Sequence, residues 1–167
     1  TRLSRGLGDV YKRQIKRFKV GVADRLLGLR LPQKNRRTGD VLRSRLMELG
    51  VYRKSGHEHL NGCVVVPIYD SSGREIRQLY GRRLDAKAPK EKRHLYLSGK
   101  LRGIFNPEAL KSRDVILCES ILDAMTFVKH GMESATCTFG TANFTDEIFD
   151  AIREAKVESV RLGFDAD

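Results

Sequence analysis

The 167-residue sequence contains no long apolar segment. A membrane-spanning helix needs about 18 or more consecutive apolar residues, and no run in this chain approaches that length. The basic N-terminus is not followed by an apolar stretch, which argues against a secretory signal. The three cysteines, Cys63, Cys118 and Cys137, are scattered and form no Cys-x-x-Cys pair. Their spacing argues against a zinc site or a disulfide framework and predicts buried free thiols in a reducing cytoplasm.

Acidic residues are scarce relative to basic ones, except near the C-terminus. The net charge is +11, from 32 Lys and Arg against 21 Asp and Glu. The cations crowd residues 1–113, whereas the last third of the chain is nearly neutral or acidic. This asymmetry favours a basic surface that faces nucleic acid, together with a separate acidic site. The alternative is a solvated basic face that has no partner.

A zinc-binding motif is also missing. The run His57-Glu58-His59 invites a metal interpretation, but it is not His-Glu-x-x-His. No further ligands are spaced to complete a site around it. We therefore expect no zinc in this chain.

The chain is expected to contain three segments. Residues 1–14 include Gly8–Gln14, which resembles translated adapter sequence, so we predict that this segment is non-native; an ordinary basic arm is the alternative. Residues 15–110 are expected to form a smaller, basic α+β subdomain that binds nucleic acid. Residues 111–167 have the pattern of an α/β domain.

Two short helices are predicted at the start of the basic subdomain. Residues 20–31 form the first, which Pro32 would end. Asp40 is a good N-cap for a second helix that runs to Leu49 and stops at Gly50. Arg43 and Arg45 project away from the apolar face of that helix and are available to phosphates, although most such arginines are merely solvated.

A β-hairpin follows, with strands at residues 63–69 and 75–80 joined by a Gly-containing turn. It leads into a charged loop and an aromatic residue flanked by cations. Aromatic rings stack on the bases of single-stranded nucleic acid while cations hold its phosphates. Tyr96 as a core residue of a third strand is the alternative. The candidate nucleic-acid-binding residues are Arg82, Arg83, Lys92, Arg93 and Tyr96.

From Val115 onward, strands alternate with helices. The predicted strands are 115–118, 135–139 and 160–164, and the predicted helices are 120–130 and 145–156. Strands that alternate with helices of this length indicate a parallel sheet. Ligands bind beyond the carboxyl ends of such strands, where this sequence places carboxylates and a Gly-Thr turn.

The carboxylates at these strand ends predict a site for Mg²⁺ or Mn²⁺. Glu119 follows the first strand, and Asp165 and Asp167 follow the third and point the same way. Asp123, four residues after Glu119, can face the same cleft. Clustered carboxylates repel one another unless a hard cation neutralises them. Glu119 is then a metal ligand or a general base. Gly140, followed by Thr141, lets a phosphate or a strand approach the backbone.

The segments Leu117–Ala124, Phe139–Ala142 and Phe164–Asp167 resemble the hallmarks of the Toprim domain, and most closely its version in bacterial DnaG-type primases. Upstream, Val64–Arg74, Gly81–Arg83 and His94–Ser98 are similar to the basic subdomain that precedes Toprim in the primase core. Residues 18–55 are reminiscent of primase-like proteins of mobile elements. Ser120 stands where the family usually has glycine. The resemblance implies that residues 111–167 are a Toprim domain, a βαβαβ sheet truncated at its C-terminus.

The family resemblance implies a cytoplasmic DNA primase, a nucleotidyltransferase that joins ribonucleoside triphosphates into RNA primers on a single-stranded DNA template. By this resemblance, Glu119 is the catalytic acid/base or a metal ligand, and Asp123 is a supporting carboxylate. Asp165 and Asp167 are metal ligands, and Arg82 or Arg83 contacts nucleic acid or the triphosphate. A replicative helicase is a possible partner. The alternatives are a Toprim nuclease or topoisomerase and an inactive module that binds single-stranded DNA.

Overall fold

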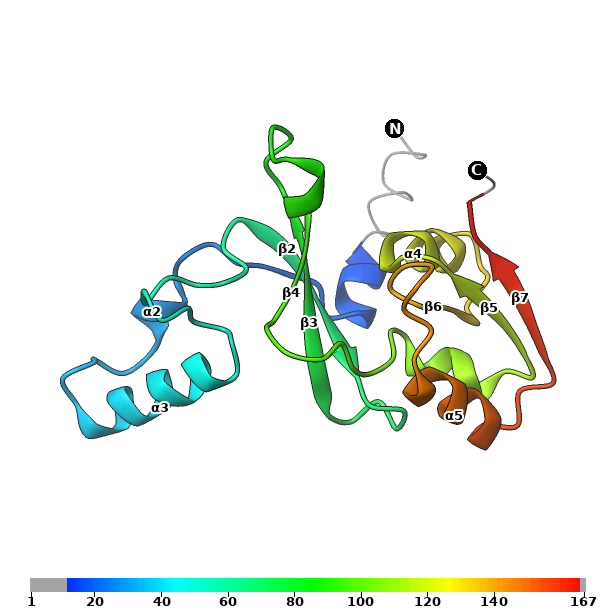
Figure 1. Cartoon of the computed structure of the whole chain (residues 1–167), viewed down its shortest axis with the longest axis horizontal. Helices are drawn as coiled ribbons and strands as arrows, with labels where there is room; N and C mark the ends of the chain where they lie inside the picture. Colours follow the sequence, from blue (N-terminus) through cyan, green and yellow to red (C-terminus); the bar gives the residue numbers. More distant parts are fainter. Residues whose placement is uncertain (1–11, 166–167) are drawn as a thin grey trace. The chain divides into compact units, whose positions relative to one another are not determined.

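The computed structural model describes residues 12–165, which divide into two compact units (Figure 1). The parallel-sheet unit contains residues 12–19, 67–78 and 102–165, and the basic unit contains residues 20–66 and 79–101. Sixteen lysines and arginines against six acidic residues lie in the basic unit, so nearly all of the net positive charge is there. Residues 1–11 of the predicted adapter-derived segment, and the predicted ligand Asp167, lie outside the described residues.

A three-stranded parallel sheet forms the centre of the parallel-sheet unit, in the order β6-β5-β7 (Figure 1). The strands are β5 (Asp114–Cys118), β6 (Ala135–Cys137) and β7 (Ser159–Gly163), and the helices between them are α4 (Ile121–Lys129) and α5 (Asp146–Glu154). This arrangement confirms the predicted βαβαβ fold.

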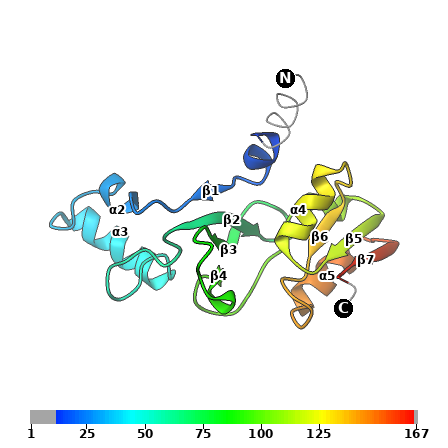
Figure 2. The same cartoon turned by 90° about the horizontal axis from the view of Figure 1, so that it is seen from above.

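The two helices of this unit lie on opposite faces of the sheet (Figure 2). The chain moves from β5 to β6 in one direction and returns past β5 to β7 in the other. Because both crossovers of a parallel sheet are right-handed, reversing the direction places α4 and α5 on different faces. The core on these faces includes the fully buried side chains of Val115, Ile121 and Ile148.

Further short elements complete this unit. Residues 12–17 are helical, and the buried Gln14 donates a hydrogen bond from Nε2 to the carbonyl of Met125 at 3.1 Å. Phe18 packs against Phe105 with ring centroids 4.9 Å apart. The 3₁₀ helix η2 (Pro107–Lys111) leads into β5. None of the helices among residues 12–165 is long and apolar enough to cross a membrane.

The antiparallel sheet has the order β1-β2-β3-β4. Its strands are β1 (Gly21–Val22), β2 (Cys63–Tyr69), β3 (Ile76–Arg83) and β4 (His94–Tyr96). The basic unit contains most of this sheet, together with α2 (Leu27–Arg30), α3 (Arg37–Glu48) and the 3₁₀ helix η1 (Lys90–Lys92). The bounds of β2 agree with the predicted strand, and β4 makes Tyr96 a strand residue, as the alternative interpretation held.

Two local predictions for the basic unit are wrong. The predicted helix at 20–31 is replaced by β1 and the single turn of α2, because Gly21 and Val22 pair with Val65 and Val64. Asp40 is not the N-cap of α3, since Arg36 holds that position and Asp40 lies in the first turn. Gly50 follows the helix with φ of 78°, as expected for a residue that ends one.

Asp70 organises the turn between β2 and β3 and carries the first testable prediction. Its carboxylate accepts hydrogen bonds from the Ser72 hydroxyl at 2.5 Å and from the amides of Arg74 and Glu75 at 2.8 and 2.9 Å. The Ser72 hydroxyl, followed by the Glu75 amide, lowers the pKa of Asp70 from 3.8 to about 2. A lowered folded-state pKa stabilises the fold above the unfolded value, and this stabilisation disappears as the pH falls toward 2.

We therefore expect Asp70→Ala to melt below the wild type at neutral pH, with a gap in Tm that closes between about pH 4 and pH 2. Thermal unfolding of both proteins across this pH range measures the gap. A gap that stayed constant down to pH 2 would show that the charged carboxylate does not hold the turn.

Candidate active site and nucleic-acid interface

Glu119 is the first residue beyond the carboxyl end of β5. The parallel register aligns Cys118 with Cys137 on β6 and with Gly163 on β7, so all three strands end at one level. In the strand order β6-β5-β7 the direction of the connections reverses at β5, so the topological switch point lies between β5 and β7. Open α/β sheets bind ligands at such a point, beyond the carboxyl ends of the strands. The Glu119 side chain is half-buried, and within residues 12–165 no hydrogen bond or ion pair engages its carboxylate.

The turn after β6 closes directly on Glu119. The Gly140 amide donates to the Glu119 carbonyl at 2.8 Å, and the Thr138 amide donates to the Cys118 carbonyl at 3.0 Å. Gly140 has φ of 121°, a conformation that side chains other than glycine rarely adopt. The structure therefore brings Glu119 and Gly140 together, as the sequence predicted. Thr141 follows on the exposed side of this turn.

Sequence reasoning missed the side chains that lock this turn. The Thr138 hydroxyl donates to the Gly140 carbonyl at 2.9 Å, and the Asn143 side-chain amide donates to the Phe139 carbonyl at 2.9 Å. Phe139 has φ of 65° and is buried. A buried phenylalanine in the left-handed region is held by its surroundings rather than by its own preference. The turn is therefore pre-formed around Gly140.

Asp123 participates in a capping box at the start of α4. Its Oδ2 accepts from the Ser120 hydroxyl at 2.6 Å and from the Ser120 amide at 3.2 Å, and the Asp123 amide donates to Ser120 Oγ at 3.3 Å. Ser120 is thus the N-cap of α4, a type of contact worth about 1 kcal/mol. The Asp123 carboxylate is at least partly engaged in this cap.

Asp165 follows β7 and is exposed. Among residues 12–165, no three His, Cys, Asp or Glu side chains gather closely enough to hold a metal ion. Asp167, which the predicted ligand set also includes, lies outside those residues. The metal-binding roles of Glu119, Asp165 and Asp167 therefore remain proposals.

The cysteines near this end of the sheet are buried free thiols, as predicted. Burial, with a smaller effect of the Asp123 carboxylate, raises the pKa of Cys118 to about 11. Burial also raises the pKa of Cys137 well above its usual range. Thiols that stay protonated at neutral pH are poor nucleophiles and poor metal ligands. Carboxylate and hydroxyl oxygens are therefore the groups that remain available to a metal ion or a proton at this end of the sheet.

Arg82 and Arg83, predicted together as nucleic-acid contacts, point to opposite faces of β3. Arg82 pairs with His94 across β3 and β4, and its guanidinium contacts the His94 ring. Arg83 instead lines a pocket on the other face and donates from Nε to the Lys92 carbonyl at 3.4 Å. Neighbouring residues of a strand alternate between its faces, so one ligand surface does not contain both side chains.

A network of rings surrounds Arg82. Tyr80 Oη lies 2.8 Å from His94 Nδ1, and the Tyr80 ring packs against Tyr96 with centroids 5.4 Å apart. Burial, together with the charges of Arg82 and Arg93, lowers the pKa of His94. The neutral imidazole then accepts from Arg82 at Nε2 and donates from Nδ1 to Tyr80. Tyr96 is half-buried in this network, so only part of its ring is available to a base.

The charged loop before β4 contains Lys92 and Arg93. Arg93 donates from Nε to the Ala88 carbonyl at 2.9 Å and from Nη2 to the Ala86 carbonyl at 3.3 Å. These bonds fold the loop onto itself and give Arg93 a structural task. Lys92 is exposed.

A Toprim-like family model matches residues 116–167. The structure is similar to a DnaG catalytic core (TM-score 0.71, 19% identity, covering 97% of this chain and 54% of that one). It is also similar to the zinc-binding and RNA polymerase domains of Aquifex aeolicus primase (TM-score 0.70, 19% identity, 96% and 42% covered).

A third similar structure is a DnaG primase catalytic domain bound to single-stranded DNA (TM-score 0.65, 20% identity, 90% and 50% covered). No curated protein matches the chain significantly. The chain spans about half the length of these solved chains. At these identities, the likeness shows that the fold is that of the primase catalytic core.

Proposed function

We propose that this chain, Toprim-like over residues 116–167 and with the fold of a primase core, takes part in RNA primer synthesis on single-stranded DNA. The observation that carries the proposal is the position of Glu119. Its carboxylate, which has no partner among residues 12–165, lies at the switch point of the sheet, beside a pre-formed glycine turn, in the segment that the Toprim-like family model matches.

The proposal includes a divalent cation, Mg²⁺ or Mn²⁺. Glu119 fits such an ion because its carboxylate offers hard oxygen donors and has no partner among the described residues. Glu119, Asp165 and Asp167 would hold the ion, which supplies a positive charge that stabilises the phosphoryl group during transfer. Glu119 alternatively accepts the proton of the attacking hydroxyl group.

The template and the ribonucleoside triphosphates are proposed to meet the basic unit. Most of the net charge lies there, and a similar solved primase domain is bound to single-stranded DNA. Arg83 and Lys92 are the best placed of the predicted contacts, because Arg93 and Tyr96 are engaged in local structure. Electrostatic binding of this kind weakens steeply as the salt concentration rises.

Primer synthesis is tested by incubating the chain, alone and together with any coding sequence that flanks it, with single-stranded DNA, ribonucleoside triphosphates and Mg²⁺. We expect short RNA products that require both template and metal. Metal-dependent cleavage of the DNA without extension would instead support a Toprim nuclease. Binding of the DNA without either reaction would support an inactive binding module.

A further inference from the structure

We propose that the basic unit contains a phosphate-binding pocket, which we call the arginine pocket, on the Arg83 face of the antiparallel sheet. The pocket has a volume of about 580 Å³. Its lining brings together four arginines, one tyrosine and one carboxylate from segments far apart in the sequence: Arg25, Arg43, Tyr52, Arg53, Glu58 and Arg83. The inference deepens the proposed function and rests on it for the source of the phosphate.

Among residues 12–165, no ion pair neutralises the arginines of this pocket. By contrast, Arg30 and Arg45, from the same unit, pair with Asp24 and Glu48. The single carboxylate, Glu58, accepts the Leu27 amide at 3.2 Å. Guanidinium groups that converge without counterions repel one another and favour an anion between them.

Buried polar atoms at this pocket lack partners. Within residues 12–165, three buried side-chain nitrogen or oxygen atoms have no hydrogen bond, and two of them, Arg43 Nε and Tyr52 Oη, belong to the lining. Tyr52 is only 7% exposed. A buried hydroxyl without a partner is destabilising, and native proteins usually satisfy such groups with protein, water or a ligand. A phosphate oxygen would supply the missing acceptor for both groups once the lining side chains shift enough to expose them.

The arginines are already oriented for this task. Arg43 donates from Nη2 to the carbonyls of Gly28 and Pro32 at 2.9 and 3.2 Å, which fixes its guanidinium beside Tyr52. Arg53 donates from Nε to His59 Nδ1 at 3.4 Å. His59 Nε2 lies 2.9 Å from the Tyr96 carbonyl, so the proton is on Nε2 and Nδ1 is free to accept. A ligand therefore meets side chains whose conformational freedom is already reduced.

Two substitutions test the pocket without disturbing the fold. Tyr52→Phe removes only the unpartnered hydroxyl, so the melting temperature should stay constant or rise. Gly28→Ala introduces a methyl group 3.5 Å from Tyr52 Oη and 3.7 Å from Arg43 Nη1, an ordinary contact that occupies the space beside the hydroxyl. Gly28 is helical, and alanine is the better helix former.

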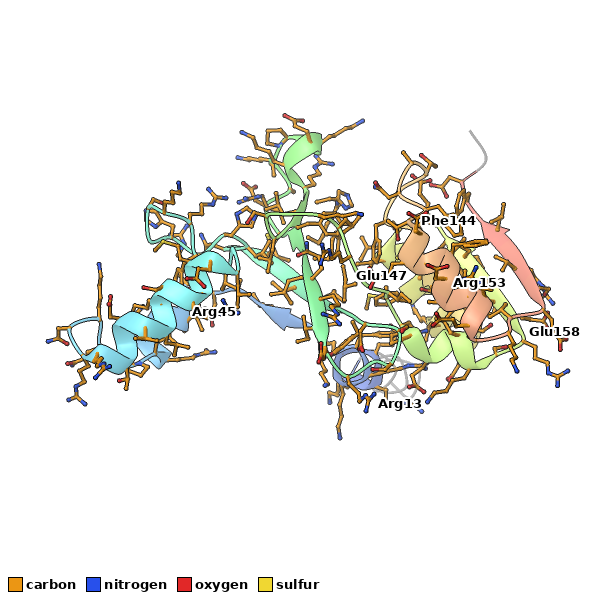
Figure 3. The ribbon with its side chains drawn as sticks, turned by 60° about the horizontal axis from the view of Figure 1, so that its bottom comes forward. Arg13, Arg45, Phe144, Glu147, Arg153 and Glu158 are labelled. Atoms are coloured by element: carbon orange, nitrogen blue, oxygen red, sulfur yellow. The ribbon has the colours of Figure 1, made fainter. Side chains whose placement is uncertain are left out.

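The matched control is Arg45→Gln. Arg45 lies on α3 (Figure 3), as Arg43 does. It forms an exposed ion pair with Glu48 at 2.8 Å and does not line the pocket. Arg43→Gln and Arg45→Gln remove the same charge from the same helix. Only Arg43→Gln should also reduce the slope of log affinity for DNA against log salt concentration, by the equivalent of about one phosphate contact.

Binding is measured with the 167-residue chain and two probes, an oligodeoxythymidylate and ATP without metal. We expect each variant to weaken binding of at least one probe about tenfold: Tyr52→Phe by losing one hydrogen bond to a charged group, and Gly28→Ala by filling the space beside the hydroxyl. Weaker binding of the oligonucleotide would show that the pocket binds backbone phosphates, and weaker binding of ATP would show that it binds a nucleotide.

Wild-type binding of both probes by both variants would overturn the inference. An equal loss in Arg45→Gln would also overturn it, because a general charge effect would then explain the data. Since binding is measured apart from primer synthesis, the two proposals fail separately. If the wild type makes primers but the variants bind both probes normally, only the pocket proposal is wrong. If the variants lose binding but the wild type makes no primers, only the proposed function is wrong.

Discussion

Glu119→Gln is expected to lower primer synthesis by about 10²–10⁴-fold, the usual contribution of a positioned acid or base, while the chain stays folded. Glutamine keeps the size of the side chain but cannot take up a proton or contribute a negative charge to a cation. The Glu119 carbonyl, which accepts the Gly140 amide at 2.8 Å, is untouched by the substitution. DNA binding should persist, because the basic unit, which does not contain Glu119, is the proposed binding surface for the template. Primer yield and DNA affinity are measured on the same preparations.

The control for this substitution is Glu158→Gln. Glu158 directly precedes β7, at the amino ends of the same parallel strands, where it pairs with Arg113 at 2.8 Å (Figure 3). Glu158 has the same carboxylate as Glu119 but lies at the opposite end of the sheet. Removing this charge breaks only a surface ion pair, so primer synthesis should stay within about twofold of wild type. Equal losses of primer synthesis in the two variants, or wild-type primer synthesis by Glu119→Gln, would show that Glu119 is not an active-site residue.

The sequence predicted those features that depend on local pattern. Alternating and apolar runs located β2 and the three parallel strands, because burial imposes a period that the residues themselves display. The carboxyl ends of parallel strands meet at one edge, so Glu119 and Gly140 were expected to be neighbours, and the 2.8 Å bond between their backbones confirms this.

Features that depend on distant pairing were not predictable in this way. The segment at 20–31 has an apolar composition that suits a helix, but pairing with Val64 and Val65 holds Gly21 and Val22 in a strand. Arg43 and Arg45 looked equivalent on one helix, yet Arg43 lines the arginine pocket and Arg45 pairs with Glu48. Tertiary contacts give the two arginines different environments, and the periodicity of the sequence does not predict such contacts.

Gly103→Ala is expected to destabilise the parallel-sheet unit by about 3 kcal/mol or more, a loss typical of severe local conflicts. Gly103 has φ of +90°, and a Cβ there would lie 2.5 Å from the Tyr69 carbonyl oxygen and 2.9 Å from Ile68 Cγ2. The backbone cannot retreat easily, because the Gly103 amide donates to Glu147 Oε2 at 2.8 Å and Ile104 pairs with Tyr69. Urea denaturation of variant and wild type measures the difference.

Gly131→Ala separates the two causes of this loss. Gly131 lies in the same unit with φ of +88°, but a Cβ there would have no neighbour within 4 Å. It should therefore cost only the conformational strain of a left-handed residue, about 1–2 kcal/mol. The excess cost of Gly103→Ala then measures the close approach of residue 103 to the Tyr69 backbone. Equal losses in the two variants would mean that the chain relaxes around residue 103 and that the close approach does not constrain the fold.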